Sequence, residues 1–157
     1  MKVLLLCGSP RPKSNTRAAL EECARALNAC GVETELVDIG AAPVSGCRAC
    51  SACAKLGRCV IDDAVNEFSA KLQAANALIV GTPVYYASPS GSIISFLDRL
   101  FYSSQGRFAH KLAASVACAR RAGTVASFDV LNKYFTIAQM HVVASTYWND
   151  VFGLAPG

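Results

Sequence analysis

Four cysteines lie close together in this 157-residue chain. They are Cys47, Cys50, Cys53 and Cys59, and they make up half of the eight cysteines present. Two-residue spacers allow several thiolates to converge on one point from a single loop, as a soft metal ion or an iron–sulfur cluster requires. A loop of free thiols, or a labile disulfide pair, is the alternative. Zinc is less favoured, because its sites usually combine two separated cysteine pairs.

Length and composition indicate one domain with a packed core. The chain is 53% hydrophobic and 17% charged, with a formal net charge of +4. Its Lys and Arg residues are scattered without a basic run, which argues against a nucleic-acid partner. The apolar run at residues 3–6 is too short for an export signal or a membrane span. We therefore expect a cytoplasmic protein with reduced thiols and no membrane partner.

Hydrophobic periodicity predicts strands that alternate with helices. Strands are expected over residues 2–7, 32–39, 77–81, 112–119 and 140–145, and helices over residues 16–30, 62–75, 88–101 and 127–139. Ser88 and Pro89 are predicted as the N-cap and first residue of the third helix. This order predicts an α/β fold with a parallel sheet covered on both faces. Ligands of such sheets bind beyond the carboxyl ends of the strands.

A loop rich in hydrogen-bond donors follows the first strand. Ser9, Ser14, Asn15 and Thr16 supply neutral donors, and Arg11 supplies a guanidinium suited to a phosphate. The loop runs into a helix, whose free N–H groups favour anions. It matches neither the Walker A motif nor the dinucleotide fingerprint, so we predict a site for one terminal phosphate. An ordinary capped turn is the alternative.

These motifs together resemble the flavodoxin-like NAD(P)H-dependent FMN reductases. Residues 8–11 (GSPR) and 14–16 (SNT) resemble the FMN phosphate loop of that family. Residues 82–86 (TPVYY), 90–91 (SG) and 96–99 (FLDR) resemble its second flavin loop and the helix that follows. Residues 119–123 (ARRAG) resemble the third loop, and residues 147–149 (YWN) match the segment after the fifth strand. The four cysteines followed by Asp62 and Asp63 resemble the iron–sulfur flavoprotein branch.

The resemblance implies a flavodoxin-like, doubly wound sheet of five parallel strands in the order 2-1-3-4-5. Residues 1–157 would form a single FMN-binding domain with a cysteine-rich loop at 46–60, and the usual final helix of the family would be missing. FMN would be the cofactor, NAD(P)H the co-substrate, and the four cysteines would hold a [4Fe–4S] cluster. The family and the apolar residues 151–155 also lead us to expect a homodimer or homotetramer.

The second and third loops supply the remaining predicted flavin contacts. Val84, Tyr85 and Tyr86 offer an apolar wall, and the backbone of residues 83–87 offers polar groups. The predicted contacts in these two loops are Pro83, Val84, Tyr85, Tyr86, Ala87, Ser88, Arg120 and Gly123. Packing at the rim is the alternative for the tyrosines. Arg120 would stabilise an anionic reduced flavin or receive a nicotinamide cofactor's phosphate, or else be an ordinary solvated arginine.

The function that the resemblance implies is that of an FMN-dependent oxidoreductase. Electrons would pass from a reduced donor through FMN, and through the cluster if present, to an acceptor such as a quinone, a flavin or a ferredoxin. The flavin would carry the chemistry, so we predict no catalytic acid or base. The alternatives are a non-enzymatic, flavodoxin-like electron carrier and a redox sensor.

Overall fold

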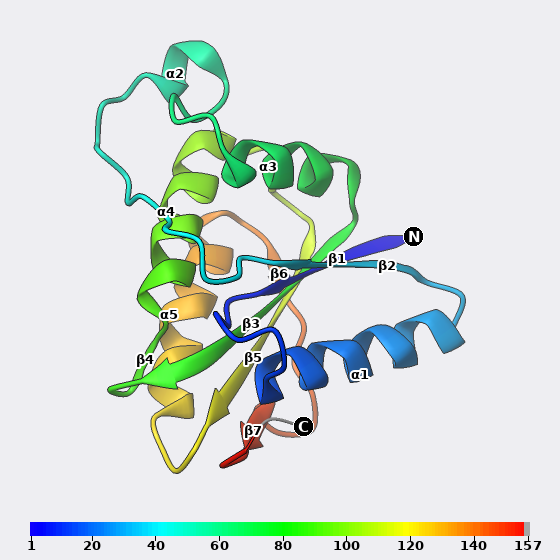
Figure 1. Cartoon of the computed structure of the whole chain (residues 1–157). Coiled ribbons are helices and arrows are strands. Elements are labelled where there is room, and N and C mark those ends of the chain that lie inside the picture. The colour runs from blue at the N-terminus through cyan, green and yellow to red at the C-terminus, as the bar shows by residue number, and fades with distance from the viewer. Residues whose placement is uncertain (156–157) are drawn as a thin grey trace.

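A parallel sheet forms the centre of the molecule in a computed structural model, which describes residues 1–155 (Figure 1). Residues 156 and 157, the end of the predicted domain, lie outside the described part. The main strands follow the order β2-β1-β3-β5-β6. Their bounds are β1 (Lys2–Cys7), β2 (Glu33–Asp38), β3 (Ala77–Tyr85), β5 (Leu112–Ala119) and β6 (His141–Val142). The predicted doubly wound order is confirmed.

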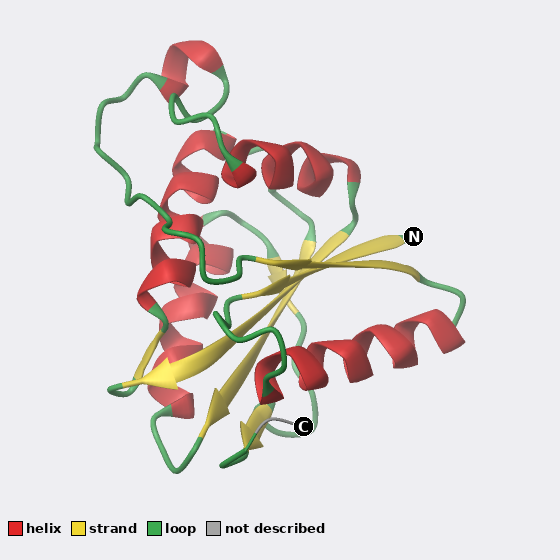
Figure 2. Ribbon diagram, viewed as in Figure 1, coloured by secondary structure: helices red, strands yellow, loops and turns green. Residues whose placement is uncertain are grey.

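Helices cover both faces of the sheet (Figure 2). The helices are α1 (Asn15–Ala29), α2 (Cys53–Leu56), α3 (Ala64–Ala74), α4 (Gly91–Ser104) and α5 (Thr124–Ile137). Helices α3, α4 and α5 lie on one face, and α1 is the helix of the described residues on the other (Figure 1). Within residues 1–155, no helix combines the length and the apolar character needed to cross a membrane.

The alternation of side chains along β1 divides the core into two layers. Leu4 and Leu6 point into the layer beneath α3, α4 and α5, where Phe68 and Phe96 meet edge to face with their ring centroids 5.6 Å apart. Leu5 points into the opposite layer, beneath α1. Because both faces of β1 are buried, its sequence is a continuous apolar run rather than an alternating one.

The start of α4 differs from the prediction. Ser88 and Pro89 form the short strand β4 (Ser88–Pro89), which pairs antiparallel with β3. Ser90 is the N-cap instead, because its Oγ accepts a hydrogen bond from the Ile93 amide at 3.4 Å. The Ser90 hydroxyl also donates to the Gly8 carbonyl oxygen at 2.9 Å. The helix is thus tied to the loop after β1.

Of the fifth strand predicted at residues 140–145, only His141 and Val142 form a strand, and a further short strand at residues 150–152 was not predicted. Strand β6 pairs with the beginning of β5, and β7 (Asp150–Phe152) pairs with its end. Between them the chain leaves the sheet edge, and the Asn149 side chain donates to the Ser115 carbonyl oxygen at 3.1 Å. A side-chain amide therefore satisfies an acceptor that a continuous strand would have paired through its backbone.

Candidate functional site

The predicted phosphate loop joins β1 to α1 at the carboxyl end of the sheet (Figure 1). Ser14 is the N-cap of α1, and its Oγ accepts from the Arg17 amide at 3.1 Å. The Ser9 Oγ accepts from the Arg11 amide at 3.3 Å. Ser9 and Thr16 are buried, whereas Arg11 is exposed. The loop therefore places the N-terminus of a helix beside hydroxyl groups and a cation, as an anion site requires.

The predicted second flavin loop is a tight hairpin rather than an irregular loop. Pro83, Val84 and Tyr85 are the last residues of β3, which turns back into β4. Tyr86 and Ala87 form the turn, with φ angles of 51° and 57°. Two left-handed residues in succession are typical of the type I′ turn, whose twist fits a two-residue hairpin. Tyr86 consequently lies fully exposed at the tip.

Gly123 brings the third loop against this hairpin. Its φ angle is 95°, and a Cβ at this position would lie 2.7 Å from the Cα of Ala87 and 3.1 Å from a methyl carbon of Val84. Both the backbone conformation and the close approach therefore require glycine. The helix α5 begins immediately afterwards, at Thr124 rather than at the predicted Ser127.

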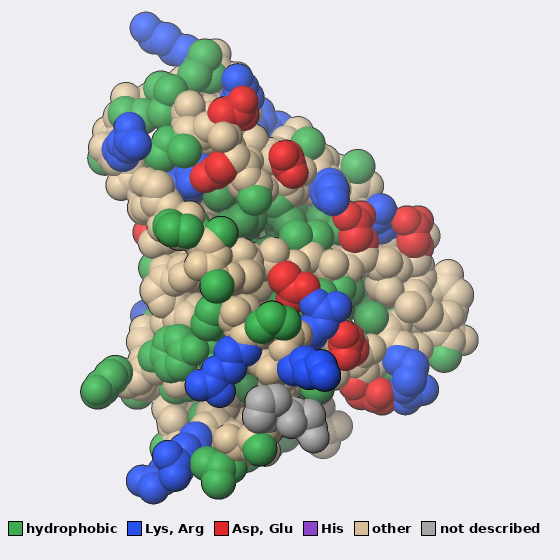
Figure 3. All heavy atoms as spheres, in the orientation of Figure 1, with side chains coloured by type: hydrophobic (Ala, Val, Ile, Leu, Met, Phe, Trp, Pro, Cys, Tyr) green, Lys and Arg blue, Asp and Glu red, His purple; other side chains and the backbone are tan. Residues whose placement is uncertain are grey.

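The three loops meet around one cavity of about 380 Å³. Nine of the thirteen predicted flavin residues line it: Ser9, Arg11, Ser14, Asn15, Thr16, Pro83, Val84, Tyr85 and Arg120. Tyr86, Ala87, Ser88 and Gly123 do not line it. Residues 153–155 form a further wall that was not predicted, and a Cβ at Gly153 would lie 1.9 Å from the Nδ2 atom of Asn15. Figure 3 shows Lys and Arg side chains gathered over this end of the molecule.

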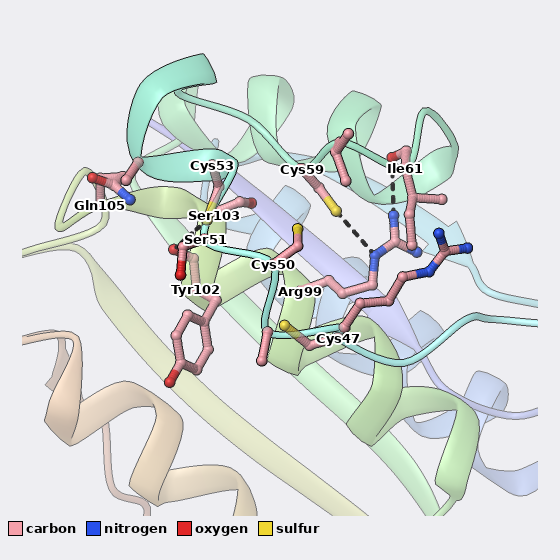
Figure 4. A pocket seen from close by; sticks show the side chains of 14 residues that line it. Cys47, Cys50, Ser51, Cys53, Cys59, Ile61, Arg99, Tyr102, Ser103 and Gln105 are labelled. Carbon is pink, nitrogen blue, oxygen red and sulfur yellow. Dashed lines mark hydrogen bonds between the residues drawn. The ribbon is translucent and has the colours of Figure 1, made fainter.

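The four predicted metal ligands line a second cavity, of about 230 Å³, between the cysteine segment and α4. Figure 4 shows their side chains around this space. All four are free thiols; Cys47 and Cys50 are exposed, while Cys53 and Cys59 are half-buried. Among residues 1–155, no group of three or more Cys, His, Asp or Glu side chains is close enough to hold a metal ion. The segment thus brings the thiols around one space without drawing them together.

A buried arginine of α4 holds the end of the cysteine segment. The Arg99 side chain is 0% exposed, and its Nη1 and Nη2 atoms donate to the two carboxylate oxygens of Asp63 at 2.6 and 2.8 Å. Its Nε atom donates to the Sγ of Cys59 at 3.3 Å. The guanidinium also donates to the carbonyl oxygen of Ile61 at 3.0 Å (Figure 4) and to that of Ser45 at 3.4 Å.

Other polar contacts fix the backbone of the same segment. The Asn66 side chain accepts from the Cys59 amide and donates to the Cys59 carbonyl oxygen, both at 3.0 Å. The Cys53 thiol donates to the Tyr102 carbonyl oxygen at 3.8 Å. Arg107 donates to the carbonyl oxygens of Gly57 and Ser103, which links α2 to α4. The cysteine segment is therefore attached mainly to α4 and to the beginning of α3.

The family model for NADPH-dependent FMN reductases matches residues 1–153 of the chain. The chain belongs to this family. An iron-sulfur flavoprotein of Methanocaldococcus jannaschii is 32% identical, and the match covers 100% of this chain and 86% of the relative. An iron-sulfur flavoprotein of Methanosarcina thermophila is 31% identical over 98% of this chain and 81% of that protein. As a member of the FMN reductase family, the chain is an FMN-dependent NAD(P)H oxidoreductase.

Solved structures support the same fold. The NAD(P)H:quinone oxidoreductase from Methanothermobacter marburgensis superposes with a TM-score of 0.77 at 18% identity, covering 100% of this chain and 86% of that one. A flavodoxin from the domain Archaea superposes with a TM-score of 0.66 at 16% identity, covering 98% of this chain and 84% of that one. At these identities the likeness establishes the flavodoxin-like fold of this FMN reductase family member.

Sequence reasoning missed the role of Arg99 in the cysteine segment. In the sequence, Arg99 stands only at the end of the motif at 96–99, and Asp63 matches only a helix start. Asp63 does cap α3, since it accepts from the Val65 amide at 3.1 Å, but it also pairs with Arg99. The two residues are 36 positions apart, and no local pattern reports such a pair.

The pair predicts a loss of stability in acid. The hydrogen bonds from Arg99 hold the pKa of Asp63 below its ordinary value of 3.8. The folded state therefore favours the ionised carboxylate of Asp63. The stability that this carboxylate contributes is fully present above the pKa of Asp63 in the unfolded chain, and it is lost as the pH falls through the lower pKa of the folded state. In Asp63→Asn the cap is retained but the charge is not. The free energy of unfolding of the variant should lie below that of the wild type near neutral pH.

Urea unfolding between about pH 2 and pH 7 measures this difference, which should shrink below about pH 4. Asp62→Asn is the matched control, because Asp62 is 78% exposed, forms its ion pair with the exposed Arg58, and otherwise accepts one long hydrogen bond of 3.3 Å from Asn66. A difference between Asp63→Asn and the wild type that is constant across this range would contradict the linkage.

Proposed function

We propose that this chain binds FMN in the cavity formed by its three loops and passes electrons from NAD(P)H to an acceptor such as a quinone, a flavin or a ferredoxin. The observation that carries the proposal is the convergence of nine predicted flavin residues, from three separate segments, around one cavity at the carboxyl ends of the strands. Flavodoxin-like sheets bind their ligands at this position.

The phosphate of FMN fits the loop between β1 and α1. Ser9, Ser14 and Thr16 supply hydroxyl groups beside the N-terminus of a 15-residue helix. The exposed guanidinium of Arg11 lines the same cavity and is free to form charge-assisted hydrogen bonds to phosphate oxygens. One phosphate, rather than a dinucleotide, suits a loop that lacks the glycine-rich fingerprint.

The hairpin and the third loop fit the flavin ring. Val84 and Tyr85 would form an apolar wall, and Gly123 allows the third loop to close against Ala87 behind it. Tyr86, Ala87 and Ser88 would shape the hairpin. Arg120 would place a positive charge near the flavin ring. FMN would supply the hydride- and electron-accepting chemistry. The residues of this chain would orient it and exclude water from one of its faces.

We also propose that Cys47, Cys50, Cys53 and Cys59 hold a [4Fe–4S] cluster. Four thiolates are the donor set that such a cluster takes, and the four thiols already line one cavity. Their separation means that cluster formation must draw the segment inward, as metal binding commonly completes local folding. The names of the two archaeal relatives, both iron-sulfur flavoproteins, agree with this chemistry.

Helix α4 would connect the two sites within one chain. Ser90 at its beginning contacts the loop after β1, and Arg99 contacts the cysteine segment. At about 1.5 Å per residue, nine residues separate these points by roughly 13 Å along the helix axis. A flavin accepts electron pairs and a cluster accepts single electrons, so this arrangement would favour the splitting of pairs.

Two measurements test the flavin proposal. FMN-loaded protein should lose its visible flavin absorbance when NADPH is added without oxygen. The double variant Arg11→Ala, Asn15→Ala should bind FMN more weakly, by about 1.5–3 kcal/mol for each charged hydrogen bond lost. Titration of the apoprotein with FMN measures the affinity.

Arg25→Ala is the control for the double variant, because Arg25 lies on the same helix and pairs with the exposed Glu22. Its FMN affinity should equal that of the wild type. An unchanged affinity in the double variant would refute the phosphate site. FMN binding without bleaching by NADPH or NADH would contradict the proposed path of electrons from NAD(P)H.

Anaerobic reconstitution tests the cluster. Protein incubated with iron and sulfide should take up about four irons per chain. Replacement of any one of the four cysteines by Ala should lower this content, whereas Cys30→Ala, at an exposed thiol outside the segment, should not. No iron after reconstitution, or zinc retained in its place, would contradict the proposal.

We further propose a homodimer or homotetramer. Large apolar side chains remain exposed near the sheet edge, among them Trp148 at 53%, Phe152 at 58% and Leu154 at 74%. Exposed apolar groups gathered in this way are typical of protein interfaces. Light scattering at micromolar concentration should report at least twice the 16.5 kDa mass of the chain. A monomer mass would refute the assembly.

A further inference from the structure

The buried guanidinium of Arg99 makes as many hydrogen bonds as it has N–H groups. Five are formed, two to Asp63 and one each to Cys59, Ile61 and Ser45. A charge so deeply buried is costly unless it is paired and hydrogen-bonded. Asp63 supplies the pairing in a bidentate geometry. Asp63 thus occupies N–H groups on both Nη atoms of the guanidinium, while the Nε–H group points toward the sulfur of Cys59.

Asp63 is itself held in place, so the guanidinium of Arg99 has little freedom to move. Its carboxylate accepts from the Val65 amide and thereby caps α3. The backbone of Cys59 is held separately by the side chain of Asn66. Donor and acceptor of the N–H···S contact are therefore positioned by different elements, α4 and the beginning of α3. The contact does not depend on the exposed part of the cysteine segment.

We propose that Arg99 is a positioning residue of the cysteine site: it holds Cys59 in place as the ordered ligand and, through its N–H···S hydrogen bond, raises the reduction potential of the bound cluster. This inference rests on the proposed [4Fe–4S] site. The guanidinium also joins the two ends of the segment, because it binds the carbonyl oxygens of both Ser45 and Ile61. Cys47, Cys50 and Cys53 would then close onto a ligand that is already fixed.

The direction of the effect on the potential follows from charge. Reduction adds negative charge to a cluster, and a hydrogen bond or a cation at a ligand sulfur stabilises that charge. Removal of the guanidinium should therefore make the cluster harder to reduce. It should also weaken iron binding, since residues that orient metal ligands typically raise metal affinity by about 10- to 100-fold.

The test compares Arg99→Gln and Arg99→Lys with Arg58→Gln. Arg58 precedes Cys59 directly and carries the same charge, but its side chain is 57% exposed and pairs with Asp62. Each protein is reconstituted without oxygen. Iron content, the rate of iron release to a chelator, and the midpoint potential from a reductive titration followed by electron paramagnetic resonance are then measured. FMN content and circular dichroism report whether each variant is folded.

We expect Arg99→Gln to release iron about tenfold faster than the wild type and to have a more negative midpoint potential. Arg99→Lys, which keeps the charge but loses the planar fork, should be intermediate, and Arg58→Gln should match the wild type. A folded Arg99→Gln with normal FMN content that takes up no iron also supports the positioning role.

Arg99→Gln with the potential and release rate of Arg58→Gln would overturn the inference. If Arg99→Gln does not fold, Arg99→Lys decides, and wild-type values in that variant overturn it. Failure of the wild type itself to take up iron would refute the proposed cluster, and the inference with it. A normal cluster in the wild type with unaffected Arg99 variants would refute the inference alone.

Discussion

The close contact among the loop after β1, the middle of β3 and the beginning of α4 is the constraint on which both proposed sites depend. The Gly8 amide donates to the Gly81 carbonyl oxygen at 2.8 Å, and the Gly8 carbonyl oxygen accepts from the buried Ser90 hydroxyl. A Cβ at Gly8 would lie 2.9 Å from the Cβ of Ile93. No other residue fits there without displacing α4. The start of the phosphate loop and the start of α4 are therefore fixed relative to each other.

From this point α4 extends to the cysteine segment, so the proposed flavin site and the proposed cluster site share one rigid element. Ile93, Phe96, Leu97 and Leu100 anchor the inner face of the helix in the core. Its other contacts reach the segment through Arg99 and through the carbonyl oxygen of Tyr102. A shift of α4 would displace both the loop after β1 and the cysteine segment, because packed helices move as units rather than deform. The family resemblance accounts for each site, but their mechanical connection appears only in three dimensions.

Local patterns predicted the parallel α/β sheet, because continuous apolar strands and capped helices are visible in the sequence, whereas the strand order and the convergence of the phosphate loop, β3 and Arg120 were implied by the family resemblance. Prediction failed where tertiary contacts override those patterns. Ser88 and Pro89 match a helix start, yet backbone pairing with Val84 and Tyr85 makes them a strand. The predicted fifth strand is shorter than expected, and the Asn149 side chain takes the place of a backbone partner where the chain leaves the sheet edge. The pairing of Arg99 with Asp63 joins residues far apart in the chain, and local periodicity carries no information about it.

The manner in which the cysteine segment is attached has a consequence for its motion. In Figure 1 it projects beyond the sheet, and its main polar attachments are made by Arg99, Asn66, Arg107 and the Cys53 thiol. Segments with few buried apolar contacts open with free energies far below that of global unfolding. The exposed thiols of Cys47 and Cys50 would thus be released by local opening while the sheet and α4 stay folded, and amide hydrogens of this segment would exchange with solvent long before those of β1. The proposed cluster could then be loaded or repaired without unfolding of the proposed flavin site.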